Sequence, residues 1–371
     1  MPQPSGLLWP ALACSGLLRS VWSGLPGRSM YPRRMRQIWI TKAGPPEVLQ
    51  VREAPDPEPG PGEVRVKVRA AGINFADLMA RVGLYPDAPK LPCVVGYEVS
   101  GEIDRLGQGI SDLALGERIF AMPRFGGYTD TLVVNRAQVF RMPAGMSFES
   151  AAALPVVYLT AYNMMFWTGN LRQGSRILIH SAAGGVGLAA IQLAKTRGCE
   201  IFGTASPGKH AFLREAGCHH PVDSGGDYAA ECRKLLGERG LDLVLDPVGG
   251  DSWKKGYDLL DKNGRMVCFG LSAAGSGKTR NLFNAALQVM RVPRFSPMKL
   301  MDDNKTVSGC NMGHLFDRLD QLTPQFQALI AMVERGEIAP RVDRSFTFAE
   351  APAAHHYLHD RKAKGKVVLV P

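Results

Sequence analysis

The residues that most clearly point to chemistry lie at positions 177–187, where the sequence reads ILIHSAAGGVG. A short apolar run, typical of a buried strand, leads directly into a glycine-rich turn, and a helical pattern follows over 186–197. The three positions of the G-x-G-x-x-G fingerprint hold the small residues Ala182, Gly184 and Gly187. Such residues permit a tight turn, close approach of the backbone to a phosphate, and close packing of the helix. Gly185 and Val186 then open the helix, whose free N–H groups favour an anion. The pattern therefore predicts a binding site for the pyrophosphate of a dinucleotide.

The end of the next strand-like run, 199–204, indicates which dinucleotide binds. A site for NAD places Asp or Glu about 20 residues after the loop to hold the ribose 2′-hydroxyl, but residues 203–209 read GTASPGK and contain no acid. A carboxylate would repel a 2′-phosphate, whereas Ser206 and Lys209 would bind one. The sequence thus favours NADPH. The alternative is that Lys209 is an ordinary solvated residue in a first helical turn.

The elements that must position this loop form an alternating pattern. A helical pattern lies at 207–216, and strand-like runs lie at 242–246 and 265–269. Such alternation predicts an α/β fold with a doubly wound parallel sheet. Upstream, a helical pattern covers 149–166, and the residues before it are β-rich, with runs at 37–41, 48–53, 64–71, 99–106 and 118–121.

The C-terminal part of the chain is expected to return to the β-rich lobe, which leaves the substrate cleft between two lobes. Its patterns are a helix at 325–335, a strand at 345–348, a helix at 349–360 and a strand at 366–370. The predicted domains are an extension (1–34), a β-rich domain (35–152), a dinucleotide-binding domain (153–310) and a return segment (311–371).

Composition excludes several function classes. The chain has 371 residues, of which 45% are hydrophobic and 21% charged, so it is large enough for two globular domains. Seven cysteines without a C-x-x-C pair argue for free thiols in a reducing compartment. The net charge is +10, but residues 1–46 hold six basic residues and no acid, which leaves +4 over the other 325 residues. Nucleic-acid binding is therefore not expected.

The extension has an apolar run at 6–18, followed by an arginine-rich tract without acids. The run is too short to span a bilayer. No basic residue precedes it, so a mitochondrial transit peptide fits better than a secretory signal. A third alternative, which we favour, is that translation begins at Met30 or Met35. The expected location is cytoplasmic, or mitochondrial if residues 1–34 are a transit peptide.

Several motifs, in order, carry a resemblance to a known family. They are AAGINFADL at 70–78, GLYP at 83–86, VGYEVSG at 95–101, LTAY at 159–162, AAGGVG at 182–187, DPVGG at 246–250 and GKVVL at 365–369. From residue 36 to 371 the chain resembles the zinc-free quinone oxidoreductase branch of the medium-chain dehydrogenases/reductases, and within it the vesicle amine transport protein group. The resemblance implies a Rossmann domain and a β-rich, GroES-like catalytic domain.

The resemblance also implies that no catalytic metal is held. Zinc-dependent relatives carry Cys, His and Cys at places that here read Asn74, Tyr97 and Val156, none of which supplies a thiolate or an imidazole. Residues 120–141 lack the cysteine cluster of a structural zinc lobe. The adjacent histidine pairs at 219–220 and 355–356 are expected to point apart and to bind no metal.

Without a metal to stabilise an alkoxide, alcohol oxidation is disfavoured, whereas reduction of a conjugated acceptor needs only positioning and a hydrogen-bond donor. The expected activity is therefore an NADPH-dependent reduction of quinones or of α,β-unsaturated carbonyl and enoyl acceptors.

By resemblance, Tyr85 lies where similar enoyl thioester reductases carry a proton-donating tyrosine; the alternative is a turn that only packs on the domain. Asn74 is expected to anchor the nicotinamide ribose or the substrate oxygen; the alternative is a cap for the turn at Asp77. Met79, an apolar and pliable side chain, replaces the hydroxyl of a second tyrosine in the quinone oxidoreductase pattern. The resemblance places four further residues near the cofactor: Thr160 beside the nicotinamide, Gly270 and Leu271 along the cofactor edge, and Lys366 near the phosphates. Tyr158 is placed near the cleft, and Tyr97 is expected to pack.

Residues 282–301 mix apolar and basic side chains. They are expected to form a packed helix at a subunit interface, in a homodimer or another homo-oligomer, with a strand near 306–312 pairing across subunits. Because basic and apolar residues together bind anionic membranes, the alternative function is a catalytically weak, nucleotide-binding regulatory or membrane-associated protein.

Overall fold

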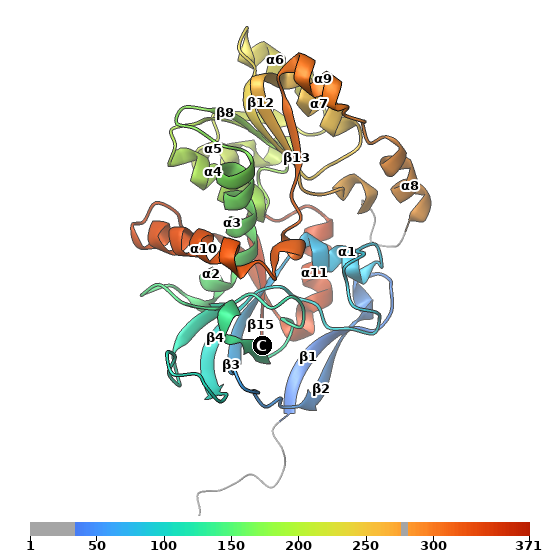
Figure 1. The fold of residues 1–371 in the computed structure, drawn as a ribbon. Helices are drawn as coiled ribbons and strands as arrows, with labels where there is room; N and C mark the ends of the chain where they lie inside the picture. Colours follow the sequence, from blue (N-terminus) through green and yellow to red (C-terminus); the bar gives the residue numbers. More distant parts are fainter. Residues whose placement is uncertain (1–33, 276–280) are drawn as a thin grey trace, which may run out of the picture. The chain divides into compact units, whose positions relative to one another are not determined.

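The computed structural model describes residues 34–275 and 281–371. The predictions for the extension, which end at residue 34, therefore lie almost entirely outside the described residues. The described chain contains two large sheets, which are drawn in the upper and lower parts of Figure 1.

The upper sheet confirms the predicted doubly wound fold. Its six strands pair in parallel in the order β10-β9-β8-β11-β12-β13. They are β8 (Arg176–Ile179), β9 (Glu200–Ala205), β10 (His220–Asp223), β11 (Leu241–Asp246), β12 (Leu260–Cys268) and β13 (Thr306–Gly309). The order reverses between β8 and β11, and a dinucleotide binds outside the carboxyl ends of the strands at such a switch point.

The lower sheet has seven strands, ordered β14-β15-β3-β4-β5-β7, with β6 also paired to β3. They are β3 (Glu63–Ile73), β4 (Val99–Leu106), β5 (Arg118–Ala121), β6 (Thr131–Asn135), β7 (Val139–Arg141), β14 (Val342–Thr347) and β15 (Lys366–Val370). The first two strands, β1 (Arg34–Ile40) and β2 (Leu49–Pro55), form a separate antiparallel pair. Because β15 pairs antiparallel with β3, the end of the chain returns to the β-rich lobe as expected.

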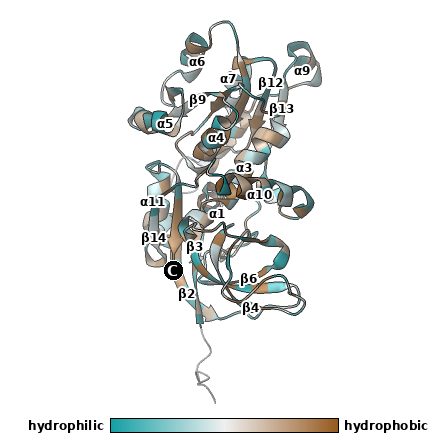
Figure 2. Ribbon diagram, turned by 90° about the vertical axis from the view of Figure 1, so that its left-hand side faces the viewer, coloured by the Kyte–Doolittle hydropathy of each residue, from teal (hydrophilic) through white to brown (hydrophobic). Residues whose placement is uncertain are grey.

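Helices cover both sheets. They are α1 (Phe75–Arg81), α2 (Phe148–Ala152), α3 (Pro155–Tyr162), α4 (Gly185–Lys195), α5 (His210–Ala216), α6 (Tyr228–Leu236), α7 (Asp251–Leu259), α8 (Leu282–Met290), α9 (Pro297–Asp303), α10 (Leu319–Glu334) and α11 (Ala351–His359). Figure 2 shows hydrophobic residues concentrated in the strands and in α4, whereas α5 and α6 are largely hydrophilic on the outside. The seven buried residues of α4 run from Gly187 to Ala194 and fix the nucleotide-loop helix in the core.

The single helix expected over 149–166 is wrong. The structure has α2, then α3, then a π-helical segment over Asn163–Thr168. Pro155 has no N–H to continue α2, and it occupies the first position of α3 instead, where a missing donor costs nothing. Because of this break, Val156 and Thr160 belong to α3 and not to α2, and the start of α3 lies at the site described next.

Candidate active site

The glycine-rich loop has the geometry that an anion site requires. It begins at the carboxyl end of β8 with Ser181, whose φ is 55°, and the N–H of Gly184 donates to the Ser181 carbonyl at 2.9 Å. α4 then starts at Gly185, and no side chain caps it. A Cβ on Gly187 would lie 2.5 Å from the carbonyl oxygen of Ala182, so only glycine permits this packing. The N–H groups of the first turn have no partner inside the helix and are available to a ligand.

A buried histidine supports the start of this loop, and sequence reasoning did not single it out. His180 Nδ1 lies 3.1 Å from the Thr204 hydroxyl oxygen, which also accepts the N–H of Ser181 at 3.3 Å. Nε2 of His180 lies 3.7 Å from an Asp246 carboxylate oxygen. Burial lowers the pKa of His180, so the ring is neutral. Its contacts hold the ends of β8, β9 and β11 together.

Lys209 and Ser206 lie just after β9, where a 2′-phosphate was predicted to bind. The ammonium of Lys209 donates to the carbonyl oxygens of Arg361 and Ala363, at 2.6 Å each. Lys209 is therefore not the ordinary solvated residue of the alternative. Burial lowers the pKa of Lys209 against the opposing effect of the Asp343 carboxylate, and the charges of Lys364 and Arg361 act in the same direction as burial. One of its three N–H donors remains for an anion.

Asn74 and Lys366, which the sequence placed separately, meet in a buried cluster. Lys366 Nζ lies 2.5 Å from Asn74 Oδ1 and 2.5 Å from Glu98 Oε1, and Asn74 Nδ2 donates to Glu98 Oε1 at 2.8 Å. The exposed fractions of Asn74, Lys366 and Glu98 are 9%, 3% and 0%, so their polar groups are hidden from water. Sequence reasoning missed Glu98, although a lone acid in the apolar motif VGYEVSG and the small residue Gly72 were both visible.

The cluster touches the glycine-rich loop. Gly365 and Gly184 form a parallel β-bridge, and a Cβ on Gly185 would lie 3.7 Å from Cδ of Lys366. Lys366, the first residue of β15 in the return segment, thus lies beside the start of α4. The structure brings together Asn74, Lys366 and Gly185, from three distant parts of the chain.

Two further neighbours fix Glu98 in place. Its Oε2 accepts the N–H of Val156 at 2.7 Å, at the start of α3. A Cβ on Gly72 would lie 2.4 Å from Glu98 Oε1, so a side chain there would displace the carboxylate. Two of the three positions that hold zinc ligands in relatives, Asn74 and Val156, therefore bond directly to Glu98, and the third, Tyr97, precedes it in the chain.

Asn74 also begins α1, as the capping alternative expects, and its anchoring role stays a prediction. Its backbone N–H donates to the Asp77 carboxylate at 2.8 Å, and the other Asp77 oxygen accepts the N–H of Gly96 at 3.1 Å. Burial raises the pKa of Asp77 to about 7, against the opposing effect of the Asn74 N–H and the Lys366 charge. The amide of Asn74 is left to face Lys366 and Glu98.

Tyr85 belongs to a different group of side chains. Its ring packs edge-on against Tyr97, with centroids 6.4 Å apart, and Tyr97 in turn contacts Phe125 and Phe316 at 5.1 and 6.1 Å. Within the described ranges, no hydrogen bond joins Tyr85 to Asn74, Glu98 or Lys366. Burial raises the pKa of Tyr85, so the phenol keeps its proton at neutral pH.

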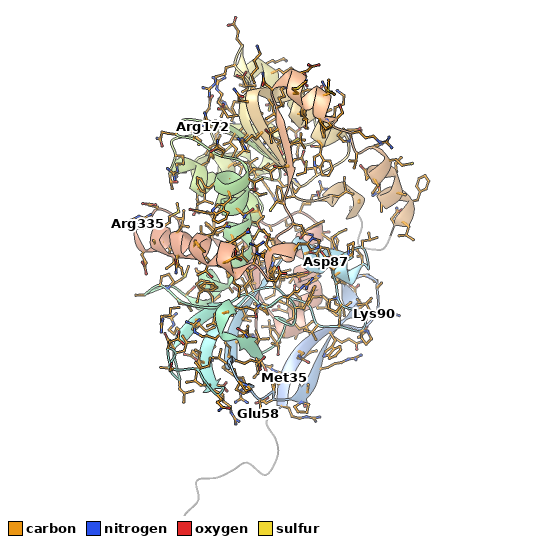
Figure 3. The ribbon with its side chains drawn as sticks, viewed as in Figure 1. Met35, Glu58, Asp87, Lys90, Arg172 and Arg335 are labelled. Atoms are coloured by element: carbon orange, nitrogen blue, oxygen red, sulfur yellow. The ribbon has the colours of Figure 1, made fainter. Side chains whose placement is uncertain are left out.

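The segment after β13 closes over the Tyr85 loop. The hydroxyl of Tyr85 lies 3.2 Å from the position of a Cβ on Gly313. Next to it, Asp87, labelled in Figure 3, accepts hydrogen bonds from His314 at 3.0 Å and Asn311 at 3.3 Å. These contacts connect the β-rich lobe to the segment that follows β13, the edge strand of the parallel sheet.

The remaining predicted residues lie at the carboxyl edge of the parallel sheet or in α3. Thr160 is 8% exposed, and the Tyr158 hydroxyl donates to Gln192 of α4 at 2.8 Å, so Tyr158 faces α4. Gly270 and Leu271 follow β12, where Leu271 Cδ1 lies 2.1 Å from the position of a Cβ on Gly249. This close contact fixes the loop beside the switch point.

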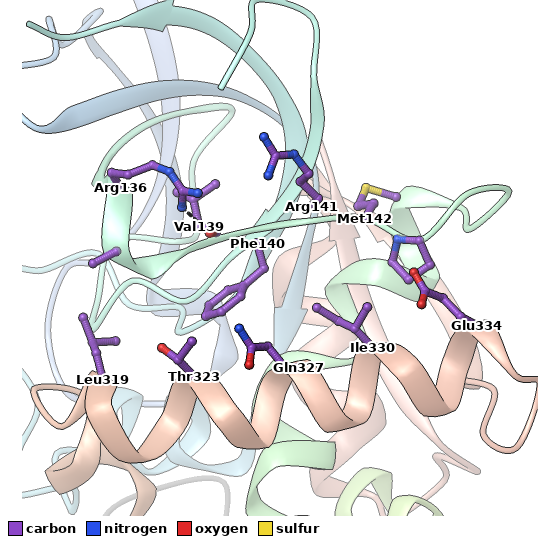
Figure 4. Close-up of a pocket in the computed structure, with 12 residues that line it drawn as sticks. Arg136, Val139, Phe140, Arg141, Met142, Leu319, Thr323, Gln327, Ile330 and Glu334 are labelled. Carbon is purple, nitrogen blue, oxygen red and sulfur yellow. Dashed lines mark hydrogen bonds between the residues drawn. The ribbon is translucent and has the colours of Figure 1, made fainter. Parts of the chain in front are cut away.

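Two cavities in the structure lie elsewhere. One, of about 410 Å³, runs between β7 and α10, with Phe140 and Ile330 among its walls (Figure 4). The other, of about 330 Å³, is lined by Arg124, Gln138, Gly313, His314, Phe316 and Asp317. The glycine-rich loop and the Asn74–Glu98–Lys366 cluster line neither cavity.

Among the described residues, no group of three or more His, Cys, Asp and Glu side chains is placed to hold a metal ion. The adjacent histidines have separate surroundings: His219 accepts the N–H of Ile201, and His220 pairs with Glu200 at 2.9 Å. No described helix is both long and apolar enough to cross a membrane.

Comparisons with known proteins agree with the fold. Residues 60–147 match the family of the alcohol dehydrogenase GroES-like domain, and residues 185–334 match that of the zinc-binding dehydrogenase. The chain is 41% identical over 325 residues to the synaptic vesicle membrane protein VAT-1 homolog of Rattus norvegicus, covering 87% of this chain and 80% of that protein. It is 34% identical over 339 residues to the quinone oxidoreductase of Pseudomonas aeruginosa, covering 91% and 99%. The solved structure of Escherichia coli quinone oxidoreductase complexed with NADPH aligns with a TM-score of 0.80 and 29% identity, covering 91% of this chain and all of that one.

Proposed function

Because the chain belongs to the medium-chain dehydrogenase/reductase superfamily, as a quinone oxidoreductase-like member of the VAT-1 group, we propose that it is an NADPH-dependent, metal-independent reductase of conjugated acceptors. Its substrate class is a quinone or an α,β-unsaturated carbonyl or enoyl compound. The observation that carries the proposal is the contact between the uncapped start of α4 and the Asn74–Glu98–Lys366 cluster. This contact supports the proposal because it would bring a phosphate at the start of α4 next to polar groups suited to an oxygen.

The residues present fit NADPH. The N–H groups at the start of α4 would hold the pyrophosphate, and Ser206 and Lys209 would hold the 2′-phosphate. Asn74 and Lys366 offer an amide and an ammonium to an oxygen of the cofactor or acceptor. When bound, NADPH supplies a hydride to the conjugated acceptor, and the chain's own groups orient the two partners and stabilise charge on the acceptor oxygen. That the E. coli relative is complexed with NADPH supports this choice.

The direct test is a spectrophotometric assay. Purified protein at micromolar concentration is mixed with NADPH and with a panel of quinones, enones and enoyl thioesters, with NADH in parallel. We expect loss of NADPH absorbance with at least one acceptor class. No turnover with any acceptor, together with no NADPH binding by calorimetry, would overturn the proposal.

Tyr85 is the proposed proton donor, and its removal tests that role. Tyr85→Phe is expected to lower kcat for an enone by about 100-fold, a typical contribution of a positioned general acid, with the NADPH dissociation constant unchanged. The phenylalanine ring keeps the edge contact with Tyr97. If kcat stays within about twofold of the wild type, Tyr85 is a packing residue of the turn.

Lys209 is the proposed determinant of the 2′-phosphate. Lys209→Met is expected to raise the dissociation constant of NADPH by about 10- to 100-fold, because a charge-assisted hydrogen bond contributes about 1.5–3 kcal/mol, while that of NADH stays unchanged. Lys305→Met is a matched control, since Lys305 also donates to a backbone carbonyl, that of Tyr257 at 3.0 Å. Equal losses for NADPH and NADH would show that Lys209 only ties down the 361–363 loop.

A second copy of the chain is the proposed partner of α8 and α9. No residue of either helix is buried, and six of their large apolar side chains are exposed: Leu282, Phe283, Val289, Met290, Met298 and Met301. β13 next to them forms the edge of the parallel sheet. Light scattering should give at least a dimer. A monomer that sediments with anionic liposomes would instead favour the membrane-associated alternative, to which the names of the VAT-1 relatives lend support.

A further inference from the structure

We propose that Glu98 is a positioning residue that keeps Lys366 as a fixed positive charge, so that the ammonium can bind a negatively charged oxygen of the cofactor or of the acceptor. The inference rests on the proposed function and assigns the site its source of positive charge in the absence of metal ligands. Glu98 itself is not expected to touch the ligand, because its carboxylate is fully buried.

The hydrogen bonds of the cluster leave one donor of Lys366 uncommitted. An ammonium has three N–H groups. One faces Asn74 Oδ1 and one faces Glu98 Oε1, each at 2.5 Å, and no other acceptor for Lys366 Nζ exists among residues 34–275 and 281–371. The methylene chain of Lys366 lies beside Gly185, at the start of the nucleotide-loop helix. The third donor is therefore uncommitted, on a side chain that lies beside the start of α4.

Burial makes the partner carboxylate necessary. Lys366 is 3% exposed, and burial disfavours a charged group that has no opposite charge beside it. Glu98 supplies the opposite charge, and it cannot move away, since one oxygen is bound to the N–H of Val156 and the other lies against Gly72. Asn74 bridges the two charges and keeps the ammonium aimed in one direction.

Two other titratable groups, Asp77 and Tyr128, face the Lys366–Glu98 pair and can contribute to its pH dependence. Asp77 of α1 interacts with both Lys366 and Glu98, and its raised pKa of about 7 gives the site one titration near neutrality. Tyr128, in the loop before β6, is fully buried and interacts with Glu98 and Asp77; burial raises its pKa, so it stays protonated. Asp77→Asn removes the only titration near neutrality among these groups and serves as the background variant.

The test is the pH profile of Glu98→Gln in the Asp77→Asn background. With Glu98 present, NADPH affinity and kcat should be flat between about pH 6 and 9. Without the carboxylate, one of the two quantities should fall as the pH rises across this range and recover toward about pH 6. A purely structural role of Glu98 would lower activity equally at every pH. An unchanged profile shape therefore overturns the inference.

The two arms of the measurement identify the oxygen that Lys366 binds. If it belongs to the cofactor, the dissociation constant of NADPH depends on pH. If it belongs to the acceptor, the rate constant of a single turnover depends on pH.

Should Glu98→Gln fail to fold, Glu98→Asp keeps the charge on a shorter side chain, and we expect a flat pH profile at reduced activity. A sloping profile would contradict the inference. A wild-type protein that neither binds NADPH nor turns over rejects the proposed function itself and is thereby distinguished from failure of the Glu98 assignment.

Discussion

Gly184→Asp is expected to weaken NADPH binding strongly without unfolding the protein. Gly184 is the N-cap of α4, with φ −82° and ψ 176°, a conformation that aspartate adopts readily at this position. The new carboxylate would accept the same N–H groups that are proposed to hold the pyrophosphate. It would also place negative charge within about 4 Å of the phosphates, where repulsion costs about 4 kcal/mol at an effective dielectric constant of about 20. We expect the NADPH dissociation constant to rise by at least about 100-fold in calorimetric titration.

The same variant should be as stable as the wild type to within about 1 kcal/mol, since aspartate is a favourable N-cap and glycine a nearly equal one. The built Cβ lies 3.3 Å from the Ser181 carbonyl, so the loop must give by only a few tenths of an ångström. Gly184→Asn is the matched control, because it can cap the same N–H groups without charge and should weaken binding less. If Gly184→Asp binds NADPH as tightly as the wild type, the start of α4 is not the pyrophosphate site.

Local patterns predicted much of the fold because several elements are specified by contiguous residues. The expected strands at 99–106, 118–121 and 366–370 coincide with β4, β5 and β15. Two helix boundaries next to prolines were predicted wrongly. A new helix, α3, begins at Pro155, where a continuous helix was expected. Pro324 lies inside α10, which begins at Leu319 and not at 325 as expected. In the second turn of a helix a proline removes one hydrogen bond, and burial of Leu322 and Phe326 on the same helix compensates.

The site was predictable only where it is local. The glycine-rich loop is a single stretch, so its residue types and spacing describe it completely. The Asn74–Glu98–Lys366 cluster joins the start of α1, the residue before β4 and the start of β15, and 292 positions separate its ends. Neither periodicity nor composition reports such a contact, which depends on the antiparallel pairing of β15 with β3. Lys209 was predicted as a phosphate ligand, but its bonds to carbonyls of the return segment depend equally on that pairing.

Lys366→Met is expected to have the largest effect on stability. It removes one partner of a buried ion pair and leaves the Glu98 carboxylate, which is fully buried, without an opposite charge. Removing one partner of such a pair costs about 3–5 kcal/mol of the free energy of unfolding. Urea unfolding at about pH 7 should show this loss as a lower midpoint with an unchanged slope. Activity with any acceptor should fall with it, because the site loses its positive charge.

The double variant Glu98→Gln/Lys366→Met separates the charge from the packing. If the loss in Lys366→Met comes from the unpaired carboxylate, neutralising Glu98 should restore most of the stability but none of the activity, because the destabilising charge is gone while the ammonium is still missing. Lys254→Met is the control, since its pair with Asp258 is exposed and should contribute little. If the double variant is no more stable than Lys366→Met, the lysine acts through the packing of its methylene chain against Gly185. The cluster would then only hold β15 against the nucleotide loop, and another residue would have to supply the positive charge of the site.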